Sequence, residues 1–220
     1  MANHNKAGFL FDLDGVLIDS EREYSRIWAQ VNKEYPSGTE SLEKVIKGCT
    51  LDKILNDHYP DQATRVKVVK RLYELEGLMK YEYLPGAENL LKTLKRLNQP
   101  IVLVTSSNDD KMAHLDEEIP ELRRLFDFIV TADLITRSKP DPEGYLLGAK
   151  KIGKNITNCI VFEDSLQGVK AGRNAGAFVI GIAGTMPREA LEPFSDLVID
   201  SLTELDPEML IKTATERDEQ

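Results

Sequence analysis

The chain has 220 residues, which is enough for one large domain or two small ones with a substantial hydrophobic core. Hydrophobic residues make up 41% and charged residues 30% of the sequence, an ordinary balance for a water-soluble globular protein. The formal net charge of −9 argues against a nucleic-acid partner, because binding nucleic acid requires a concentrated basic face.

Short apolar runs rich in Val, Ile and Phe recur along most of the chain. They are almost continuously apolar rather than alternating, which is typical of strands buried on both faces of a sheet. In chain order the predicted strands are residues 8–13, 101–105, 128–131, 159–162, 177–182 and 196–199.

Between the first two runs, residues 20–83 contain no convincing strand and show only successive amphipathic helical patterns. The apolar stripes are Tyr24, Ile27, Trp28 and Val31; Leu42, Val45 and Ile46; Leu51, Ile54 and Leu55; and Val66, Val69, Leu72 and Tyr73. The plain explanation is a small helical bundle inserted after the first strand. Leu84, Pro85 and Gly86 then mark the return to the sheet. We therefore predict a core domain of residues 1–19 and 84–220 and a helical domain of residues 20–83, with a cleft between them.

Helical patterns separate the remaining strands. One predicted helix places apolar residues at Ala87, Leu90, Leu91, Leu94 and Leu97, and another at Tyr145, Leu146, Ala149 and Ile152. Strands that alternate with helices predict an α/β fold, with a parallel sheet between two helical layers as in Rossmann-like proteins.

Polar residues follow the carboxyl ends of the predicted strands, which is where open parallel sheets bind ligands. In chain order these segments are Asp12-Leu13-Asp14-Gly15, Thr105-Ser106-Ser107-Asn108, Arg137-Ser138-Lys139-Pro140 and Glu163-Asp164-Ser165. Crowded carboxylates repel each other unless a cation or a proton intervenes, so the acidic residues predict a magnesium site. An EF-hand calcium loop is the alternative for Asp-x-Asp-Gly, but such a loop continues with further acids, and Val16-Leu17-Ile18 follows here.

This cluster indicates phosphoryl transfer. A carboxylate can attack a phosphoryl group to form an aspartyl-phosphate, and a cation with hydrogen-bond donors stabilises the charge on the equatorial oxygens. Magnesium would cover one side of the phosphoryl group and Lys139 another, while Thr105 and the backbone amides after it could donate hydrogen bonds. Asp14 is placed to protonate the departing oxygen and then to take a proton from the attacking water.

The chain resembles the haloacid dehalogenase superfamily, in the subgroup that contains β-phosphoglucomutase and related phosphatases. The resemblance extends from Phe9 to about Leu202, and the segment 168–176 also fits it. Its four motifs occur in order, as Phe11-Asp12-Leu13-Asp14-Gly15-Val16-Leu17, Val104-Thr105-Ser106-Ser107, Ser138-Lys139-Pro140-Asp141-Pro142 and Phe162-Glu163-Asp164-Ser165.

The resemblance implies a role for each motif. Asp12 corresponds to the nucleophile and Asp14 to the general acid and base. Thr105, Ser106 and Lys139 correspond to the phosphate-binding segment, with Lys139 also neutralising Asp12. Magnesium would be held by the Asp12 carboxylate, the Asp14 backbone carbonyl and Asp164, with Glu163 reaching it directly or through water. The helical insert corresponds to the family's cap, which closes over the site and selects the substrate.

Some of these residues have structural alternatives. Lys139 could be a solvated loop lysine, although Asp141 as the N-cap and Pro142 in the first turn of a helix favour a fixed orientation. Thr105 could cap the helix that follows it, and Glu163 could orient the neighbouring groups without binding the metal itself. Tyr24 and Trp28 are expected in the core of the cap rather than against the substrate, with the alternative that Tyr24 faces the cleft. We also expect changes at Tyr24 and Lys47 to alter substrate ranking.

The expected activity is magnesium-dependent hydrolysis of a small phosphorylated metabolite. Asp14 argues against the dehalogenases, because halide departs without a proton. A β-phosphoglucomutase-like mutase is the first alternative. It typically has a histidine where this chain has Tyr24, and an arginine after the glycine that matches Gly48, whereas Cys49 to Asp52 offer no basic residue. The second alternative is a phosphoacceptor signalling module, but receiver domains are much shorter and lack a helical insert.

The remaining features concern location and partners. No run approaches the ~18 apolar residues of a membrane span, and the first residues lack the apolar stretch of a signal peptide. Cys49 and Cys159 form no disulfide framework, and Cys159 is expected to be a buried thiol. We therefore expect a cytoplasmic protein without a membrane partner, with a monomer as the default state.

Overall fold

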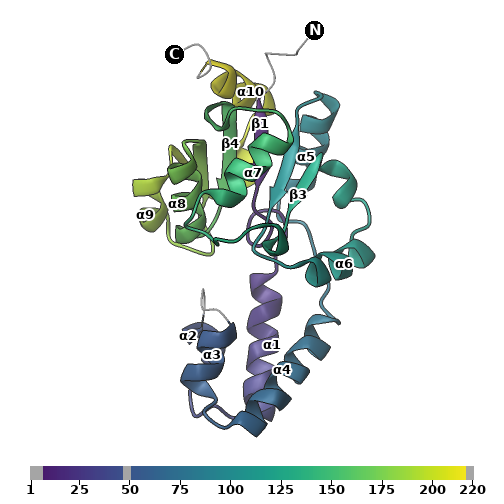
Figure 1. Ribbon diagram of the computed structural model, residues 1–220, viewed down its shortest axis with the longest axis vertical. Coiled ribbons are helices and arrows are strands. Elements are labelled where there is room, and N and C mark those ends of the chain that lie inside the picture. The colour runs from purple at the N-terminus through teal and green to yellow at the C-terminus, as the bar shows by residue number, and fades with distance from the viewer. Residues whose placement is uncertain (1–6, 47–50, 217–220) are drawn as a thin grey trace. The chain divides into compact units, whose positions relative to one another are not determined.

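The computed structural model describes residues 7–46 and 51–216 and divides the chain into two compact units. The sheet unit comprises Met1–Asp19 and Tyr81–Gln220, and the helical unit comprises Ser20–Lys80. Figure 1 shows the helical unit as the purple and blue helices that interrupt the chain after its first strand. The second boundary lies three residues before the one predicted from the sequence, at residue 80 rather than 83.

The sheet unit is built on a six-stranded parallel sheet in the order β3-β2-β1-β4-β5-β6. Each strand lies within or overlaps one predicted apolar run, so the predicted α/β fold is confirmed. The strands are β1 (Gly8–Phe11), β2 (Ile101–Val104), β3 (Phe128–Val130), β4 (Cys159–Glu163), β5 (Phe178–Ile182) and β6 (Leu197–Ile199). The order reverses at β1, whose neighbours are β2 and β4, and ligands of such sheets bind at this reversal point.

The central strands are buried on both faces, which explains their continuous apolar sequence. Every residue of β1, β2 and β4 is buried. Side chains alternate across a strand, so Leu10 joins the core cluster on one face while its neighbour Phe11 lies on the other. There the Phe11 ring stacks on Phe162 of β4, with 4.2 Å between the ring centroids. Cys159 is buried, as expected.

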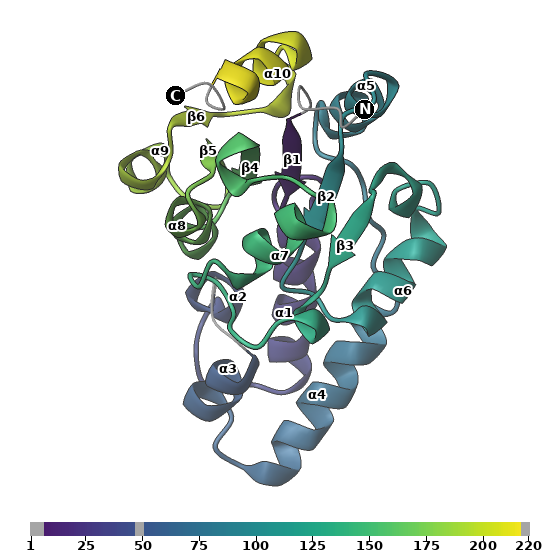
Figure 2. The ribbon, with the colours of Figure 1, turned by 45° about the horizontal axis from the view of Figure 1, so that its top comes forward.

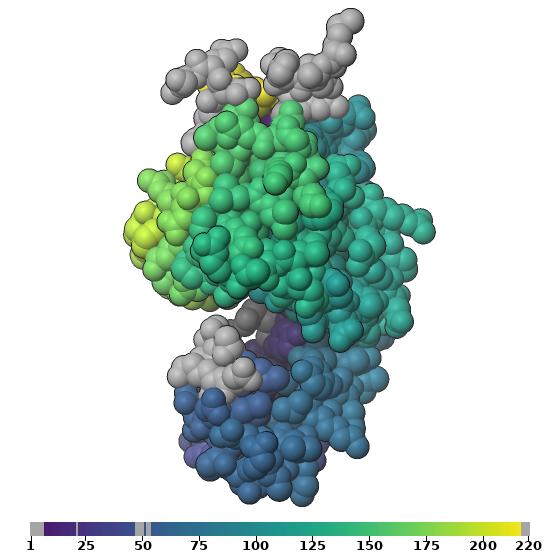
Figure 3. Space-filling model, in the orientation of Figure 1, coloured from purple at the N-terminus to yellow at the C-terminus, as the bar shows by residue number. Residues whose placement is uncertain are grey.

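Helices cover both faces of the sheet (Figures 1 and 2). On one face, α7 (Glu143–Lys151) packs against β1, β2 and β3, and α8 (Leu166–Ala175) packs against β4 and β5. On the other face, α5 (Ala87–Arg96) packs against β2 and against α10 (Pro207–Glu216). In the space-filling view, the teal and green segments form most of the visible surface of the sheet unit (Figure 3).

The sheet unit contains two further helices and five 3₁₀ turns within the described residues. They are α6 (Asp109–Glu118), α9 (Arg188–Leu191) and the 3₁₀ turns Arg123–Leu125, Ala132–Leu134, Ile156–Asn158, Glu192–Phe194 and Leu202–Glu204. The helix after β2 is capped by Asn108, whose side chain accepts a hydrogen bond from the Lys111 amide at 3.0 Å. Thr105 therefore does not cap α6. Helix α7 begins at Glu143, with Pro142 rather than Asp141 at the N-cap.

The helical unit contains α1 (Glu21–Glu34), α2 (Leu42–Val45), α3 (Leu51–His58) and α4 (Gln62–Glu76). Helix α1 packs against α2 and α4. The buried hydrophobic side chains of this unit are Ile27, Trp28, Val31, Leu42, Ile46, Ile54, Tyr59, Val68, Leu72 and Met79. No helix within the described ranges is long and apolar enough to cross a membrane.

The predicted buried face of α4 is wrong in part. Val66 and Tyr73 are 62% and 59% exposed, whereas Val68 and Leu72, four residues apart, are buried. Apolar residues lie on several sides of α4, so their spacing does not determine which side meets α1. Val45, which was also assigned to a buried stripe, is 57% exposed.

Candidate active site

Three carboxylates meet at the carboxyl ends of the adjacent strands β1 and β4. Asp12 follows β1, Glu163 ends β4 and Asp164 comes directly after it. Each offers an oxygen atom, and these oxygens all lie within 4.8 Å of one another. Their residues are only 8%, 0% and 4% exposed, so the negative charges gather in a site with little access to water.

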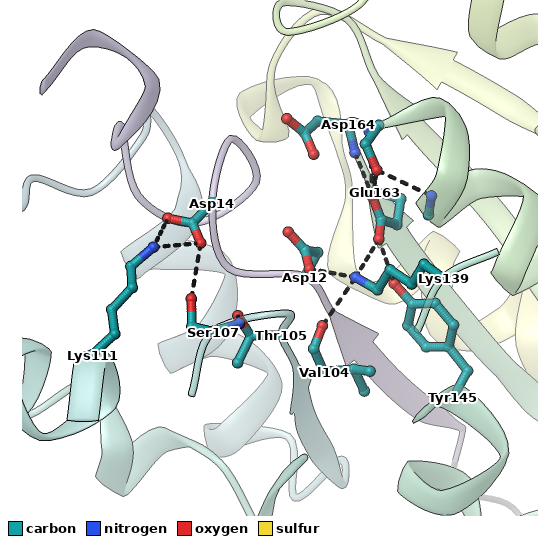
Figure 4. A network of polar contacts seen from close by, with 12 residues as sticks. Asp12, Asp14, Val104, Thr105, Ser107, Lys111, Lys139, Tyr145, Glu163 and Asp164 are labelled. Carbon is teal, nitrogen blue, oxygen red and sulfur yellow. Dashed lines mark hydrogen bonds and ion pairs between the residues drawn. The ribbon is translucent and has the colours of Figure 1, made fainter. Parts of the chain in front are cut away.

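Lys139 points into this cluster, as Figure 4 shows. Its Nζ donates to Asp12 Oδ1 at 2.5 Å, to Glu163 Oε1 at 2.5 Å and to the Val104 carbonyl at 3.2 Å. All three donors of the ammonium group are therefore used. The alternative of a solvated loop lysine is wrong, because its side chain is only 12% exposed.

One lysine does not balance the three carboxylates. Burial raises the pKa of Asp12 to about 7, with Lys139 acting against the rise and Glu163 adding to it. Burial, together with Glu163 and Asp12, also raises the pKa of Asp164 well above its usual range. The carboxylates of Asp12 and Glu163 raise the pKa of Lys139 despite its burial, so it stays charged. A divalent cation fits this set, since oxygen donors with excess negative charge are what Mg²⁺ prefers.

Glu163 differs from the two aspartates in its surroundings. Its carboxylate accepts hydrogen bonds from Lys139, from the Tyr145 hydroxyl and from the backbone amides of Asp164 and Ser165. A metal ion would have to displace one of these donors to reach it. Of the predicted ligands, Asp12 and Asp164 thus have more capacity to bind a cation directly than Glu163.

The chain turns sharply after Asp12, through the segment that carries Asp14. The Gly15 amide donates to the Ile18 carbonyl at 2.9 Å, and Gly15 has a φ of +76°. A Cβ at this position would lie 1.9 Å from Asp164 Oδ2, so a side chain is excluded on both grounds. The same Cβ would lie 2.9 Å from the hydroxyl oxygen of Thr185, in the loop after β5, and Thr185 acts to lower the pKa of Asp164. Thr185 lies outside the four motifs, and the sequence analysis did not predict that it belongs to the site.

The Asp14 carboxylate faces α6 rather than Lys139 (Figure 4). Its two oxygens lie 2.9 Å from Lys111 Nζ, and the Ser107 hydroxyl donates to Oδ2 at 3.2 Å. The carboxylate is therefore oriented by two groups from the segment after β2. Lys111 was not predicted either, and nothing in its sequence context distinguishes it from a surface lysine.

The segment after β2 also contains the predicted phosphate-binding residues. Thr105 is 2% exposed, and its hydroxyl oxygen accepts a hydrogen bond from the Ser107 amide at 3.0 Å, which orients the side chain. The hydroxyl proton of Thr105 can still be donated to a ligand. Ser106 is exposed. In the helical unit Trp28 is buried, as expected, Tyr24 is half-buried, and Lys47 lies outside the described residues.

The sequence matches known proteins over most of its length. Residues 6–176 match the family model for haloacid dehalogenase-like hydrolases. A probable pseudouridine-5'-phosphatase of Saccharomyces cerevisiae is 36% identical over 79% of this chain and 80% of the relative. Hexitol phosphatase A of Escherichia coli is 32% identical over 90% of this chain and 92% of the relative.

A similar fold occurs among solved structures. The crystal structure of a β-phosphoglucomutase from Clostridium difficile superposes with a TM-score of 0.76 at 27% identity. The superposition covers 98% of this chain and 100% of that one.

Proposed function

Because the chain belongs to the haloacid dehalogenase-like hydrolases, we propose that it hydrolyses the phosphate monoesters of small metabolites through an aspartyl-phosphate on Asp12. The observation that carries the proposal is the buried Asp12 carboxylate, held by Lys139 at 2.5 Å beside Asp164. The names of the two relatives describe phosphatases of a nucleoside phosphate and of hexitol phosphates, which supports a small phosphorylated, hydroxyl-rich substrate.

In the first step an oxygen of Asp12 attacks phosphorus, and the bond from phosphorus to the ester oxygen breaks. Lys139 fixes Oδ1 of the nucleophile and supplies positive charge. Thr105 would donate its hydroxyl to a phosphoryl oxygen. Asp14 gives a proton to the departing ester oxygen, which leaves as an alcohol.

In the second step a water molecule attacks the phosphorus of the aspartyl-phosphate. Asp14, now ionised, takes the proton of that water, and the bond between phosphorus and the Asp12 oxygen breaks. Inorganic phosphate and the original carboxylate result. Lys111 and Ser107 hold the Asp14 side chain between the two steps, because they contact its oxygens from outside the acidic cluster.

Magnesium fits the same residues. The Asp12 and Asp164 carboxylates and the Asp14 backbone carbonyl would hold it, with Glu163 reaching it through water. The bound ion would offset the negative charge of the carboxylates and of the phosphoryl group. The motivation is the burial and the excess negative charge of the cluster, because burial first and then the neighbouring carboxylates raise the pKa values of Asp12 and Asp164.

The helical unit is proposed to act as a cap that selects small substrates. It is inserted just after the segment that carries Asp14. The two connections to it run side by side in the sheet unit, since the Asp19 amide donates to the Glu82 carbonyl at 3.1 Å and the Leu84 amide to the Leu17 carbonyl at 2.9 Å. A change in the backbone conformation of these connections would therefore shift the segment that carries Asp14.

A screen of phosphate monoesters tests the proposal. Sugar, polyol and nucleoside phosphates are compared with a folded phosphoprotein at equal phosphate concentration in the presence of Mg²⁺, and ranked by kcat/KM. We expect one or more small esters to be hydrolysed efficiently and the phosphoprotein poorly. A protein that releases no phosphate from any ester above the uncatalysed rate would contradict the proposed function.

Removal of the metal is expected to abolish this activity. Excess chelator should reduce phosphate release to background, and added Mg²⁺ should restore it, because without a cation the buried carboxylates repel the phosphate. Calcium should restore little activity, since it prefers more ligands at longer distances. Rates measured across a titration of each metal provide the comparison. Full activity in excess chelator would show that the acidic cluster does not bind a catalytic metal.

A sugar-phosphate mutase is the second candidate, favoured by the structural match to a β-phosphoglucomutase. Tyr24 and the absence of a basic residue from Cys49 to Asp52 stand against it, although residues 49 and 50 lie outside the described residues. Incubation with β-glucose 1-phosphate distinguishes the two. A mutase yields glucose 6-phosphate, whereas a phosphatase yields glucose and inorganic phosphate.

A further inference from the structure

Both carboxylate oxygens of Glu163 are engaged by hydrogen-bond donors. Oε1 accepts from Lys139 Nζ at 2.5 Å and from the Tyr145 hydroxyl at 2.8 Å. Oε2 accepts from the Asp164 amide at 3.1 Å, and from the amide and hydroxyl of Ser165 at 3.3 and 3.0 Å. A carboxylate offers about four lone-pair positions. These donors therefore use the acceptor capacity of Glu163, and the residue can bind a cation only by losing one of them.

Tyr145 reaches Glu163 from α7 and lies outside the four motifs. Tyr145 is 1% exposed and belongs to the core cluster on this face of the sheet, so its ring is enclosed by other core residues. Burial, followed by the charges of Glu163 and Asp12, raises the pKa of Tyr145 well above its usual value, so the hydroxyl keeps its proton. Lys139 Nζ also lies 5.2 Å from the centre of the Tyr145 ring. One tyrosine thus contacts both members of the Lys139–Glu163 pair (Figure 4).

Helix α8 holds the other side of the Glu163 carboxylate. Ser165 is the N-cap of this helix, and the backbone amides of Asp164 and Ser165, just before its first turn, donate to Oε2. The helix comes so close that a Cβ at Gly168 would lie 1.8 Å from Glu163 Cδ and Oε1. Because α7 and α8 also pack against each other, the carboxylate is clamped between two helices.

We propose that Tyr145 is a positioning residue, whose hydroxyl keeps Glu163 bound to Lys139 and away from the metal site, and so aligns Lys139 with Asp12. The inference rests on the proposed function, because it takes Asp12 as the nucleophile. Lys139 lies at 2.5 Å from both Asp12 and Glu163, so the two carboxylates compete for one ammonium group. The Tyr145 hydroxyl is a second hydrogen-bond donor to Glu163 Oε1, so Glu163 attracts Lys139 less strongly. Lys139 therefore stays bound to both Asp12 and Glu163. Without the hydroxyl, Glu163 would turn toward the metal and would no longer hold Lys139 in line with Asp12.

Tyr145→Phe tests this directly, because it removes one oxygen atom and keeps the ring. With the best ester from the screen, kcat should fall about tenfold while KM stays within about twofold, as for a lost hydrogen bond to a charged group that acts on the chemical step. The Mg²⁺ dissociation constant, measured by calorimetry without substrate, should fall by about threefold or more, because Glu163 becomes available to the ion.

Two further variants complete the design. Tyr59→Phe is the matched control, since Tyr59 is a buried tyrosine of the helical unit whose hydroxyl makes no hydrogen bond among the described residues. It should leave kcat and magnesium affinity unchanged. Gly168→Ala displaces Glu163 from the other side. The double variant Gly168→Ala/Tyr145→Phe should then differ in kcat from Gly168→Ala by less than about twofold. In the single variant the Tyr145 hydroxyl has already lost its contact with the Glu163 carboxylate.

The outcomes separate clearly. If kcat of Tyr145→Phe stays at the wild-type value, or if it falls without a change in magnesium affinity, the hydroxyl does not position Glu163 and the inference is wrong. Tighter magnesium binding without a loss of kcat would also overturn it, because Lys139 would then not depend on Tyr145. A wild-type protein that hydrolyses no ester would instead remove the proposed function. Calorimetry, which needs no turnover, would still decide whether the hydroxyl keeps Glu163 from the metal.

Discussion

Replacing Asp12 with asparagine is expected to reduce turnover by at least about 10⁴-fold and to eliminate the phosphoenzyme. The amide oxygen of asparagine can still accept a hydrogen bond from Lys139, so the site should keep its shape, but a neutral amide does not attack phosphorus. The measurement is phosphate release together with acid-quenched protein after incubation with a ³²P-labelled ester. Label that is stable in acid and released by hydroxylamine identifies an acyl-phosphate in the wild type.

Asp110→Asn is a suitable control for this experiment. Asp110 lies exposed in the first turn of α6, and the same change there should preserve both turnover and labelling. Circular dichroism and a thermal melt establish that the Asp12→Asn protein is folded. Retention of the label by folded Asp12→Asn protein would place the nucleophile elsewhere and refute the proposed mechanism.

Asp14→Asn is expected to slow the hydrolysis of alkyl phosphates by about 10²- to 10⁴-fold, the usual contribution of general acid and base catalysis. An asparagine can still accept hydrogen bonds from Lys111 and Ser107, and the backbone carbonyl that would contact magnesium is unchanged. What is lost is the proton that the carboxyl group passes to the departing oxygen. An activated aryl phosphate has a leaving group that needs little protonation, so its cleavage should slow much less.

The variant also separates the two steps of the reaction. With an aryl phosphate, Asp14→Asn should form the aspartyl-phosphate readily but hydrolyse it slowly, because the attacking water has lost its base. A burst of phenolate followed by accumulation of labelled protein is the expected time course, with Asp110→Asn as the control. Equal losses on alkyl and aryl esters, without accumulation, would mean that Asp14 has no role in proton transfer.

Membership of a hydrolase family decides between the enzymatic and signalling interpretations of the sequence. A parallel sheet with an aspartate cluster, a hydroxyl and a lysine is compatible with both. The match over residues 6–176, together with relatives named as phosphatases, identifies a hydrolase family rather than a receiver domain. The variants above test the individual roles of Asp12 and Asp14.

Much of the fold was predictable from the sequence because its signals are local. A strand buried on both faces must be apolar at every position, so β1, β2 and β4 appear as continuous runs such as Ile101–Val104. Parallel strands bring their carboxyl ends to one edge of the sheet, and polar residues at those ends therefore had to be neighbours. Asp12, Thr105 and Asp164 could be grouped on this basis alone, whereas Lys139 lies in the long loop after β3 and was assigned to the site with the help of the family resemblance.

The partners of these residues could not be predicted, because they depend on tertiary packing. Lys111 lies 97 residues from Asp14, and Tyr145 lies 18 residues from Glu163 on another element. Neither has a sequence context that separates it from an ordinary surface lysine or a core tyrosine. The buried face of α4 was likewise decided by its contact with α1, since Val66 and Val68 are equally apolar and only one is covered.

The sequence by itself therefore determined the order of the elements, the sheet edge that carries the site and the residue types gathered there. Only the tertiary structure decided how these residues share their charges. Glu163 illustrates the difference, because its sequence position suits a metal ligand while its hydrogen bonds commit it to Lys139 and Tyr145. The physical reason is that apolar periodicity and strand ends can be recognised from a few neighbouring residues. The direction of a buried carboxylate depends instead on which donors the packing of distant helices brings within about 3 Å of it.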